Sequence, residues 1–227
     1  MQHLRYLVFV PARAGSKGVP NKNMRVLKGK PLVQWTFEAA LESTHVDGIH
    51  CSSDDPHILE LAQAMELTAF ERPSELAQDD SKIIDVVLYH LDLLESQHQT
   101  KVEYLVLMQP TSPVREIGLL DRAIRTLEKT GKRSLIAVAD VIQHPFDCLS
   151  LDEEGHAHYL TDFSKTTNRQ SYGDFYFITG SLYIVSTQML REKRVFMDEN
   201  SYCLITSKDQ NVDINDEIDW KIAEALI

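Results

Sequence analysis

The segment PARAGSKGVPNKN, residues 11–23, combines residue types that suit the binding of phosphate groups. Gly15 and Gly18 let the backbone approach a ligand closely and turn N–H groups toward an anion. The basic residues of the segment are Arg13, Lys17 and Lys22. Together these features suit a triphosphate, although the segment has neither the Walker A spacing nor the G-x-G-x-x-G dinucleotide fingerprint. The alternative is a glycine turn with solvated lysines.

Charge is distributed unevenly along the chain. The formal net charge of the 227 residues is −11, which argues against a general affinity for nucleic acid or for an anionic membrane. Residues 1–37 nevertheless contain no Asp or Glu, where an even spread of the 34 acidic residues would place about five or six. The basic residues of this stretch are Arg5, Arg13, Lys17, Lys22, Arg25, Lys28 and Lys30. A cationic N-terminus on an acidic protein predicts a pocket for a small polyanion, with chance as the alternative.

Strand and helix patterns alternate ahead of residue 141. The nearly continuous apolar run Leu4–Val10 is typical of a strand buried on both faces of a parallel sheet. Further strands are expected at Gly48–Ser53, Thr68–Phe70, Tyr104–Met108 and Leu135–Ala139. One helix is expected to begin at Pro31, a second after the cap residue Asp55, and a third to run from Ile83 to Leu94. A fourth is indicated by the spacing of Ile117, Leu120, Ile124 and Leu127 and is closed by Gly131.

This alternation predicts one Rossmann-like α/β nucleotide-binding domain over residues 1–227, with a mostly parallel sheet and helices on both faces. Ligands of such sheets bind at the carboxyl ends of the strands, where residues 11–23 lie. Residues 141–179 are polar and aromatic-rich, and we interpret them as an excursion from the sheet and a candidate dimerisation arm. Strand character returns at Gly180–Val185, and a helix with Ile218, Ile222 and Ala225 on one face ends the chain.

Residues 11–23 resemble the nucleotide-binding motif of the acylneuraminate cytidylyltransferases, the CMP-sialic acid synthetases, and of their relatives that activate legionaminic and pseudaminic acids. Further segments follow in the order of that family: SSDD at 52–55, ERPSELAQDD at 71–80, LMQPTSPVR at 107–115, NRQ at 168–170, TGSLYI at 179–184 and VDINDEIDW at 212–220. Their number and order make the resemblance specific over most of the chain. It implies a nucleotidyltransferase that moves CMP from CTP to the anomeric hydroxyl of a sialic-type nonulosonic acid, releasing pyrophosphate.

The resemblance implies roles for individual residues. The expected nucleotide-binding residues are Ala12, Arg13, Gly15, Ser16, Lys17, Lys22, Asn23, Arg72 and Ser81. The expected sugar-binding residues are Gln109, Arg169, Gln170, Tyr183 and Phe196. Arg169 is assigned to the sugar carboxylate because a guanidinium fork matches a carboxylate in two hydrogen bonds. Tyr183 and Phe196 would face an N-acyl group, with plain core aromatics as the alternative, and Arg115 either meets the substrate or anchors its loop.

The segment DINDEID, residues 213–219, is the candidate metal site. By resemblance the cofactor is Mg²⁺, and its expected ligands are Asp213 and Asn215. The expected catalytic residues are Arg13, Lys17 and Asp213. The family commonly has D-I-D here, so Asn215 is a departure: its carbonyl can coordinate a metal but cannot accept a proton from the sugar hydroxyl. We interpret Asp216 and Asp219 as acids that cap the following helix.

Two other functions stay open at this point. One is a CMP-Kdo synthetase or another sugar nucleotidyltransferase, against which the SKGVPNKN and NRQ segments favour the sialic type. The other is a nucleotide-binding relative without catalysis, which Asn215 favours and the many retained charged residues oppose.

The setting of the protein is also predicted from its composition. The three cysteines, Cys51, Cys148 and Cys203, are widely spaced and suggest neither a disulfide framework nor a zinc site. The N-terminus shows no targeting segment, so we expect a cytoplasmic protein. The expected partners are CTP, a nine-carbon 2-keto-3-deoxy acidic sugar and, by resemblance, a second copy of the chain in a homodimer.

Overall fold

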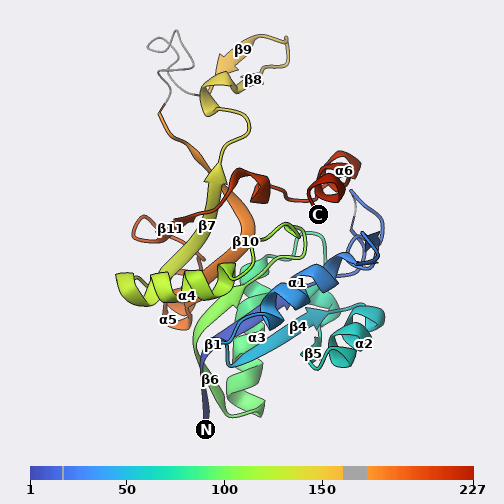
Figure 1. Ribbon diagram of the computed structural model, residues 1–227, viewed down its shortest axis with the longest axis vertical. Coiled ribbons are helices and arrows are strands. Elements are labelled where there is room, and N and C mark those ends of the chain that lie inside the picture. Colours follow the sequence, from blue (N-terminus) through green and yellow to red (C-terminus); the bar gives the residue numbers. More distant parts are fainter. Residues whose placement is uncertain (17, 161–172) are drawn as a thin grey trace.

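The computed structural model describes residues 1–16, 18–160 and 173–227. Within these residues the chain forms one α/β domain around a seven-stranded sheet (Figure 1). In spatial order the strands are β11 (Tyr202–Ile205), β7 (Ser134–Asp140), β10 (Tyr176–Ser186), β6 (Thr100–Leu107), β1 (Gln2–Pro11), β4 (Gly48–Ser53) and β5 (Thr68–Glu71). The prediction of an α/β fold is therefore confirmed.

Most neighbouring strands run in parallel, as predicted. β1 pairs with β4 and β6, β4 with β5, and β7 with β11, all in parallel. β10 is antiparallel to both of its neighbours, β6 and β7. The chain leaves the sheet at the carboxyl end of β7 and returns from that same end, so β10 has to run in the opposite direction.

Helices cover both faces of the sheet. They are α1 (Leu32–Leu41), α2 (Pro56–Ala64), α3 (Ile83–Gln97), α4 (Leu119–Thr130), α5 (Thr187–Lys193) and α6 (Glu217–Leu226). α1, α2 and α4 pack on one face with Val8 and Val10 of β1, whereas α3 and α5 pack on the other with Leu7 and Phe9. Successive side chains of β1 thus enter opposite layers, which explains its continuous apolar run.

Two helices differ in detail from the prediction. Ile117 is 90% exposed and precedes α4, because Gly118 at φ +74° starts that helix. In α6 the predicted helix is present, but Trp220 and Ala223 are its buried residues, while Ile218 and Ile222, whose spacing indicated the helix, are exposed. The indole of Trp220 sets the rotation of the helix by packing into an apolar cluster beside the first loop.

Residues 141–160 extend away from the body (Figure 1). They contain a short hairpin of β8 (Leu149–Leu151) and β9 (Ala157–Tyr159), with exposed apolar side chains on both strands. A second small hairpin, β2 (Val26–Leu27) with β3 (Lys30–Pro31), leads into α1. The assignment of residues 141–179 as a dimerisation arm stays a prediction. No helix in the described ranges is both long and apolar enough to span a bilayer.

The strand order places a crevice next to β1. From β1 the chain moves outward to β4 and β5, and it then crosses back to β6 on the other side of β1. The loops that follow β1 and β6 therefore diverge at the carboxyl edge of the sheet, which is where open α/β sheets bind ligands.

Candidate active site

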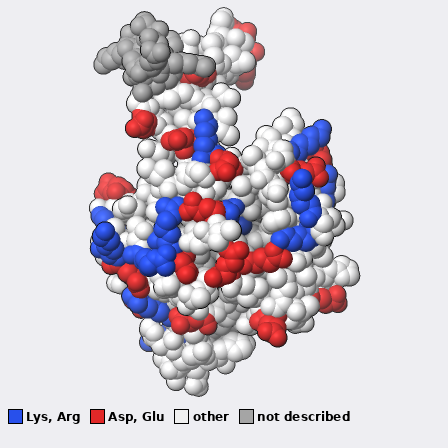
Figure 2. All heavy atoms as spheres, in the orientation of Figure 1, with Lys and Arg blue, Asp and Glu red and all other residues white. Residues whose placement is uncertain are grey.

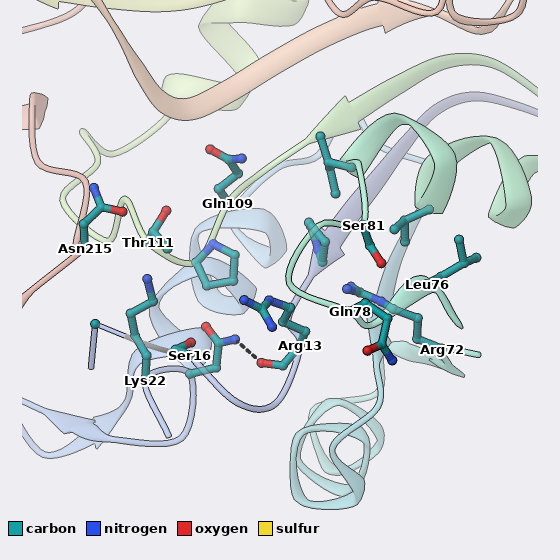
Figure 3. Close-up of a pocket in the computed structure, with 16 residues that line it drawn as sticks. Arg13, Ser16, Lys22, Arg72, Leu76, Gln78, Ser81, Gln109, Thr111 and Asn215 are labelled. Atoms are coloured by element: carbon teal, nitrogen blue, oxygen red, sulfur yellow. Dashed lines mark hydrogen bonds between the residues drawn. The ribbon is translucent and has the colours of Figure 1, made fainter. Parts of the chain in front are cut away.

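A pocket of about 360 Å³ opens at the carboxyl ends of β1 and β6 (Figure 3). The loop after β1 contributes Arg13, Ser16, Gly18, Lys22 and Asn23. The segment before and into α3 contributes Arg72, Leu76, Gln78, Ser81, Ile83 and Val86, and the loop after β6 contributes Gln109, Pro110 and Thr111. Asn215 approaches from the C-terminal segment. Segments far apart in the sequence thus meet at one point.

The loop after β1 is fixed from both sides by side chains of other segments. The backbone N–H of Ala14 donates to Asp54 Oδ1 at 2.7 Å, and Asn23 Nδ2 donates to the carbonyl of Arg13 at 2.9 Å. Gly15 has φ +66°, a conformation that L side chains rarely adopt. These contacts hold the backbone in a turn from which the Arg13 side chain enters the pocket (Figure 3).

The same loop is held tightly against the C-terminal segment. A Cβ added to Gly18 would lie 1.9 Å from the carbonyl oxygen of Asn215, so only glycine fits. Lys22 Nζ donates to the carbonyl of Ile214 at 2.6 Å. We call this contact of residues 18–22 with residues 213–215 the loop clasp. It brings the predicted phosphate-binding and metal-binding segments together.

An apolar cluster supports the loop clasp from below. Its buried members are Val19, Leu27, Leu32, Val114, Val212, Ile214, Trp220 and Ala223. The Arg25 guanidinium lies 4.1 Å above the Trp220 ring and donates to Glu217 at 2.5 Å. Asp216 caps α6 in a capping box with Asp219, as the sequence predicted. The helix is thereby fixed in position beside the pocket.

Positive charge in the pocket comes from two segments, the loop after β1 with Arg13 and Lys22 and the segment after β5 with Arg72. Burial lowers the pKa of Lys22, an effect that the nearby Asp213 opposes and the nearby Arg13 reinforces. Burial also lowers the pKa of Arg72, whose Nη2 donates to the carbonyl of Ser52 at 2.7 Å. The cations are therefore partly desolvated and repel one another, which favours an anionic ligand between them. On the face shown in Figure 2, by contrast, acidic and basic side chains are interspersed.

The loop after β6 is positioned by Arg115. Its guanidinium donates to Thr36 Oγ1 at 2.9 Å, to the carbonyl of Ser181 at 3.1 Å and to the carbonyl of Gln109 at 2.6 Å. Arg115 therefore acts as the loop anchor, one of its two predicted alternatives, and it is not among the residues that line the pocket.

A β-bulge in β10 makes room for the Gln109 side chain. The pairing of β10 with β7 shifts register between Ile178 and Tyr183, and Gly180 within the bulge has φ +72°. A Cβ on Gly180 would lie 2.7 Å from Gln109 Oε1. The TGSLYI segment is thus explained by the close approach of Gln109, whose amide reaches the pocket (Figure 3).

Asp213 and Asn215 lie together at one side of the pocket. Asn215 Nδ2 donates to Asp213 Oδ2 at 3.0 Å, and the backbone N–H of Asn215 donates to Asp219 Oδ2 at 2.8 Å. Among the residues that the structure describes, no group of three or more His, Cys, Asp and Glu side chains could enclose a metal. One carboxylate and one amide suit a Mg²⁺ ion that takes its remaining ligands from water and phosphate oxygens.

The structure brings together most of the predicted site residues. Those that line the pocket are Arg13, Ser16, Lys22, Asn23, Arg72, Ser81, Gln109 and Asn215. Ala12 is buried beneath the loop, and Asp213 lies behind Asn215. Tyr183 and Phe196 contact each other at 5.9 Å between ring centroids and pack on the α3 side of the core, outside the pocket lining. Lys17, Arg169 and Gln170 lie outside the described residues.

Several lining residues were not predicted. They are Pro11, Leu76, Gln78, Ile83, Val86, Pro110 and Thr111, whereas Gly18 also lines the pocket and was predicted as a close approach to the ligand. Leu76, Gln78, Pro110 and Thr111 belong to the quoted motifs ERPSELAQDD and LMQPTSPVR, in which Arg72 and Gln109 were the predicted binding residues.

Comparisons with known proteins identify proteins that this chain resembles in sequence. The profile of the cytidylyltransferase family matches residues 7–212. The CMP-N,N'-diacetyllegionaminic acid synthase of Legionella pneumophila is 34% identical over 228 residues, which cover 99% of this chain and 97% of that protein. The N-acylneuraminate cytidylyltransferase of Escherichia coli O18:K1:H7 is 28% identical over 96% of this chain. That match covers 51% of the relative, so this chain spans about half of its length.

Two solved structures have similar folds. CMP:2-keto-3-deoxy-manno-octonic acid synthetase complexed with CTP superimposes with a TM-score of 0.71 at 14% identity, covering 98% of both chains. 4-Diphosphocytidyl-2C-methyl-D-erythritol synthase from Anaerococcus prevotii superimposes with a TM-score of 0.67 at 15% identity, covering 97% of this chain and 95% of the other. At such identities the likeness shows the fold alone.

Proposed function

The chain belongs to the cytidylyltransferase family, and we propose that it transfers CMP from CTP to the anomeric hydroxyl of a nonulosonic acid, releasing pyrophosphate. The observation that carries this proposal is the convergence of Arg13, Lys22 and Arg72 on one pocket beside Gln109 and the 213–215 segment. The whole-length similarity to a CMP-N,N'-diacetyllegionaminic acid synthase supports a nonulosonic acid as acceptor.

The basic loop would bind the phosphates of CTP. Arg13, Lys22 and Lys17 are the proposed phosphate ligands, together with backbone N–H groups near Gly15 and Ser16. The amide of Asn23 donates to the Arg13 carbonyl, so Asn23 fixes the conformation of the loop and also lines the pocket. Arg72 and the backbone near Ser81 are proposed to lie against the nucleoside, where Leu76, Ile83 and Val86 supply apolar surface.

The sugar would occupy the side of the pocket between Gln109 and Asn215. Gln109 is proposed to bind sugar hydroxyls, and Arg169 and Gln170 to bind the carboxylate end. Tyr183 and Phe196 form an aromatic pair next to the bulge that admits Gln109, and we propose that this pair contacts the N-acyl group. Burial raises the pKa of Tyr183, and the nearby carboxylate of Asp213 raises it further.

The reaction depends mainly on the positioning of charged groups around the phosphates and needs no covalent intermediate with the protein. The anomeric oxygen attacks the α-phosphorus, the bond from that phosphorus to the bridging oxygen breaks, and pyrophosphate leaves while the hydroxyl proton is lost to solvent or a nearby base. Arg13 and Lys22 would stabilise charge that develops on the leaving group. Asp213 and Asn215 would hold Mg²⁺, which when bound neutralises phosphate charge. Asn215 cannot be the base, because an amide does not accept the proton.

The test is pyrophosphate release from CTP and Mg²⁺ with N-acetylneuraminic, legionaminic, pseudaminic and Kdo acids, with the CMP-sugar identified by mass. UTP in place of CTP is the matched control for the nucleotide. Product with one nonulosonic acid supports the proposal. Product with Kdo alone would assign the chain to the CMP-Kdo type, and no product from protein that still binds CTP would favour the non-catalytic alternative.

We also propose that the chain is a cytoplasmic homodimer in which residues 141–179 contact the second copy. The exposed apolar side chains of the β8–β9 hairpin support this, since large apolar groups on an extended arm gain by being covered. Sedimentation of the intact protein and of a variant with charged residues at Leu149 and Leu151 is the test: the intact chain should sediment as a dimer and the variant as a monomer.

A further inference from the structure

The side chain of Arg13 is paired with an acid in the pocket. Arg13 Nη2 lies 2.8 Å from Asp79 Oδ1, and the two side chains are 32% and 43% exposed. Asp79 belongs to the stretch between the short 3-10 turn Ser74–Leu76 and α3. Neighbours of Asp79 in this stretch, Gln78 and Ser81, line the pocket. The ion pair therefore connects the proposed phosphate loop with the segment at the nucleoside end.

The ion pair of Arg13 with Asp79 reduces the repulsion among the cations of the pocket. Burial is the main cause that lowers the pKa values of Lys22 and Arg72, and the nearby Arg13 lowers both further, so Arg13 repels the other two cations. The carboxylate of Asp79 offsets part of this repulsion. A triphosphate brings several negative charges to the same cations, and it would then compete with the carboxylate for Arg13 and be repelled by it.

We propose that Asp79 competes with polyphosphates for Arg13, which it holds until a polyphosphate displaces it, and that Asp79 thereby lowers the affinity of the pocket for polyphosphates. A ligand without phosphates cannot take Arg13 from Asp79, so it gains nothing from this cation. A nucleoside triphosphate takes Arg13 and also has to overcome the nearby carboxylate. Asp79 therefore weakens the binding of every ligand that engages Arg13 and leaves other ligands unaffected. The inference rests on the proposed function, in which CTP is the ligand.

Asp79→Asn is the variant that tests this, because it keeps the shape of the side chain and removes the charge. The neighbouring Asp80→Asn is the matched control. The Asp80 side chain is exposed and forms no ion pair with the residues that the structure describes, so this variant removes the same charge one position further along the chain. CTP affinity is measured by calorimetry with Mg²⁺ and no sugar, and cytidine affinity by equilibrium dialysis. We expect Asp79→Asn to bind CTP about two- to fivefold tighter, the range for an exposed ion pair.

Three further measurements keep the inference falsifiable. Cytidine affinity should be unchanged in Asp79→Asn, and CTP affinity in Asp80→Asn should stay near that of the wild type. In an Arg13→Ala background, Asp79→Asn should no longer tighten CTP binding, because its competitor is gone. Weaker CTP binding by Asp79→Asn, or a gain that is equal in Asp80→Asn or persists without Arg13, would overturn the inference alone. A wild-type protein that does not bind CTP would overturn the proposed function as well.

Discussion

A pair of buried histidines should make the fold sensitive to mild acid. His50 of β4 and His90 of α3 are 8% and 3% exposed, and His50 Nδ1 lies 2.9 Å from His90 Nε2. The rings of Phe9 and Phe70 pack against His90 at 4.9 and 4.5 Å between centroids. Burial lowers the pKa of His50 to about 4 and that of His90 to about 3, with neighbouring histidines adding to the effect. Both rings are therefore neutral in the folded protein at neutral pH.

The sign of the effect follows from proton binding in the two states. An unfolded histidine has a pKa of about 6.5, so below that pH the unfolded chain binds more protons than the folded chain. The stability contributed by the neutral pair is present above pH 6.5 and is lost as the pH falls toward the folded values. At pH 5 each histidine lowers the free energy of unfolding by about 2 kcal/mol, and the pair lowers it by about 4 kcal/mol. This is a large part of the roughly 5–15 kcal/mol by which a typical domain is stable.

Urea unfolding followed by far-ultraviolet circular dichroism at pH 7 and pH 5 measures this cost. The wild type should lose about 4 kcal/mol more between these two pH values than the double variant His50→Phe/His90→Phe, which has no titrating group there. His57→Gln is the control, because it removes a histidine that is 74% exposed and lies outside the buried pair. Equal losses in the wild type and in the double variant would refute the reasoning.

Three other predictions concern the pocket. Gly18→Ala should reduce kcat/KM by about 100-fold, because the added Cβ displaces the loop clasp. Gly173→Ala is the control and should keep wild-type activity, because a Cβ on Gly173 meets no atom within 4 Å. Equal activity of the two variants would contradict the role of the loop clasp. Asp213→Ala should lower kcat by about 100-fold or more with an unchanged circular dichroism spectrum, and near wild-type turnover would remove Asp213 from the site. Asn215→Asp should have equal or higher activity with a shifted pH–rate profile, so a folded but inactive protein would show that Asn215 does more than replace a carboxylate.

The sequence was a good guide where local patterns decide structure. The strand Gly48–Ser53 and the Asp55 cap of α2 were predicted as found, because both depend on neighbouring residues only. Arg13 and Lys22 were predicted from their positive charge beside glycines and Gln109 from the resemblance, and all three line the pocket.

Other features depend on contacts between distant segments and could not be predicted. The antiparallel direction of β10 follows from where the arm returns to the sheet. The buried face of α6 depends on the packing of Trp220 against Arg25. The ion pair of Arg13 with Asp79 joins residues 66 positions apart (79 − 13). Likewise, the need for Gly18 becomes clear only when Asn215 is seen against it.

The loop clasp also affects how the protein is made. Lys22 and Ile214 are separated by 192 positions, so the ribosome makes the two halves of the loop clasp at widely separated times. Domains form cooperatively once their sequence is available, and synthesis proceeds at about 5–20 residues per second. For roughly ten seconds or more the cationic loop exists without the segment that shapes it. A nascent or prematurely terminated chain would therefore lack a formed nucleotide site, and activity would appear only in molecules that have been translated through residue 215.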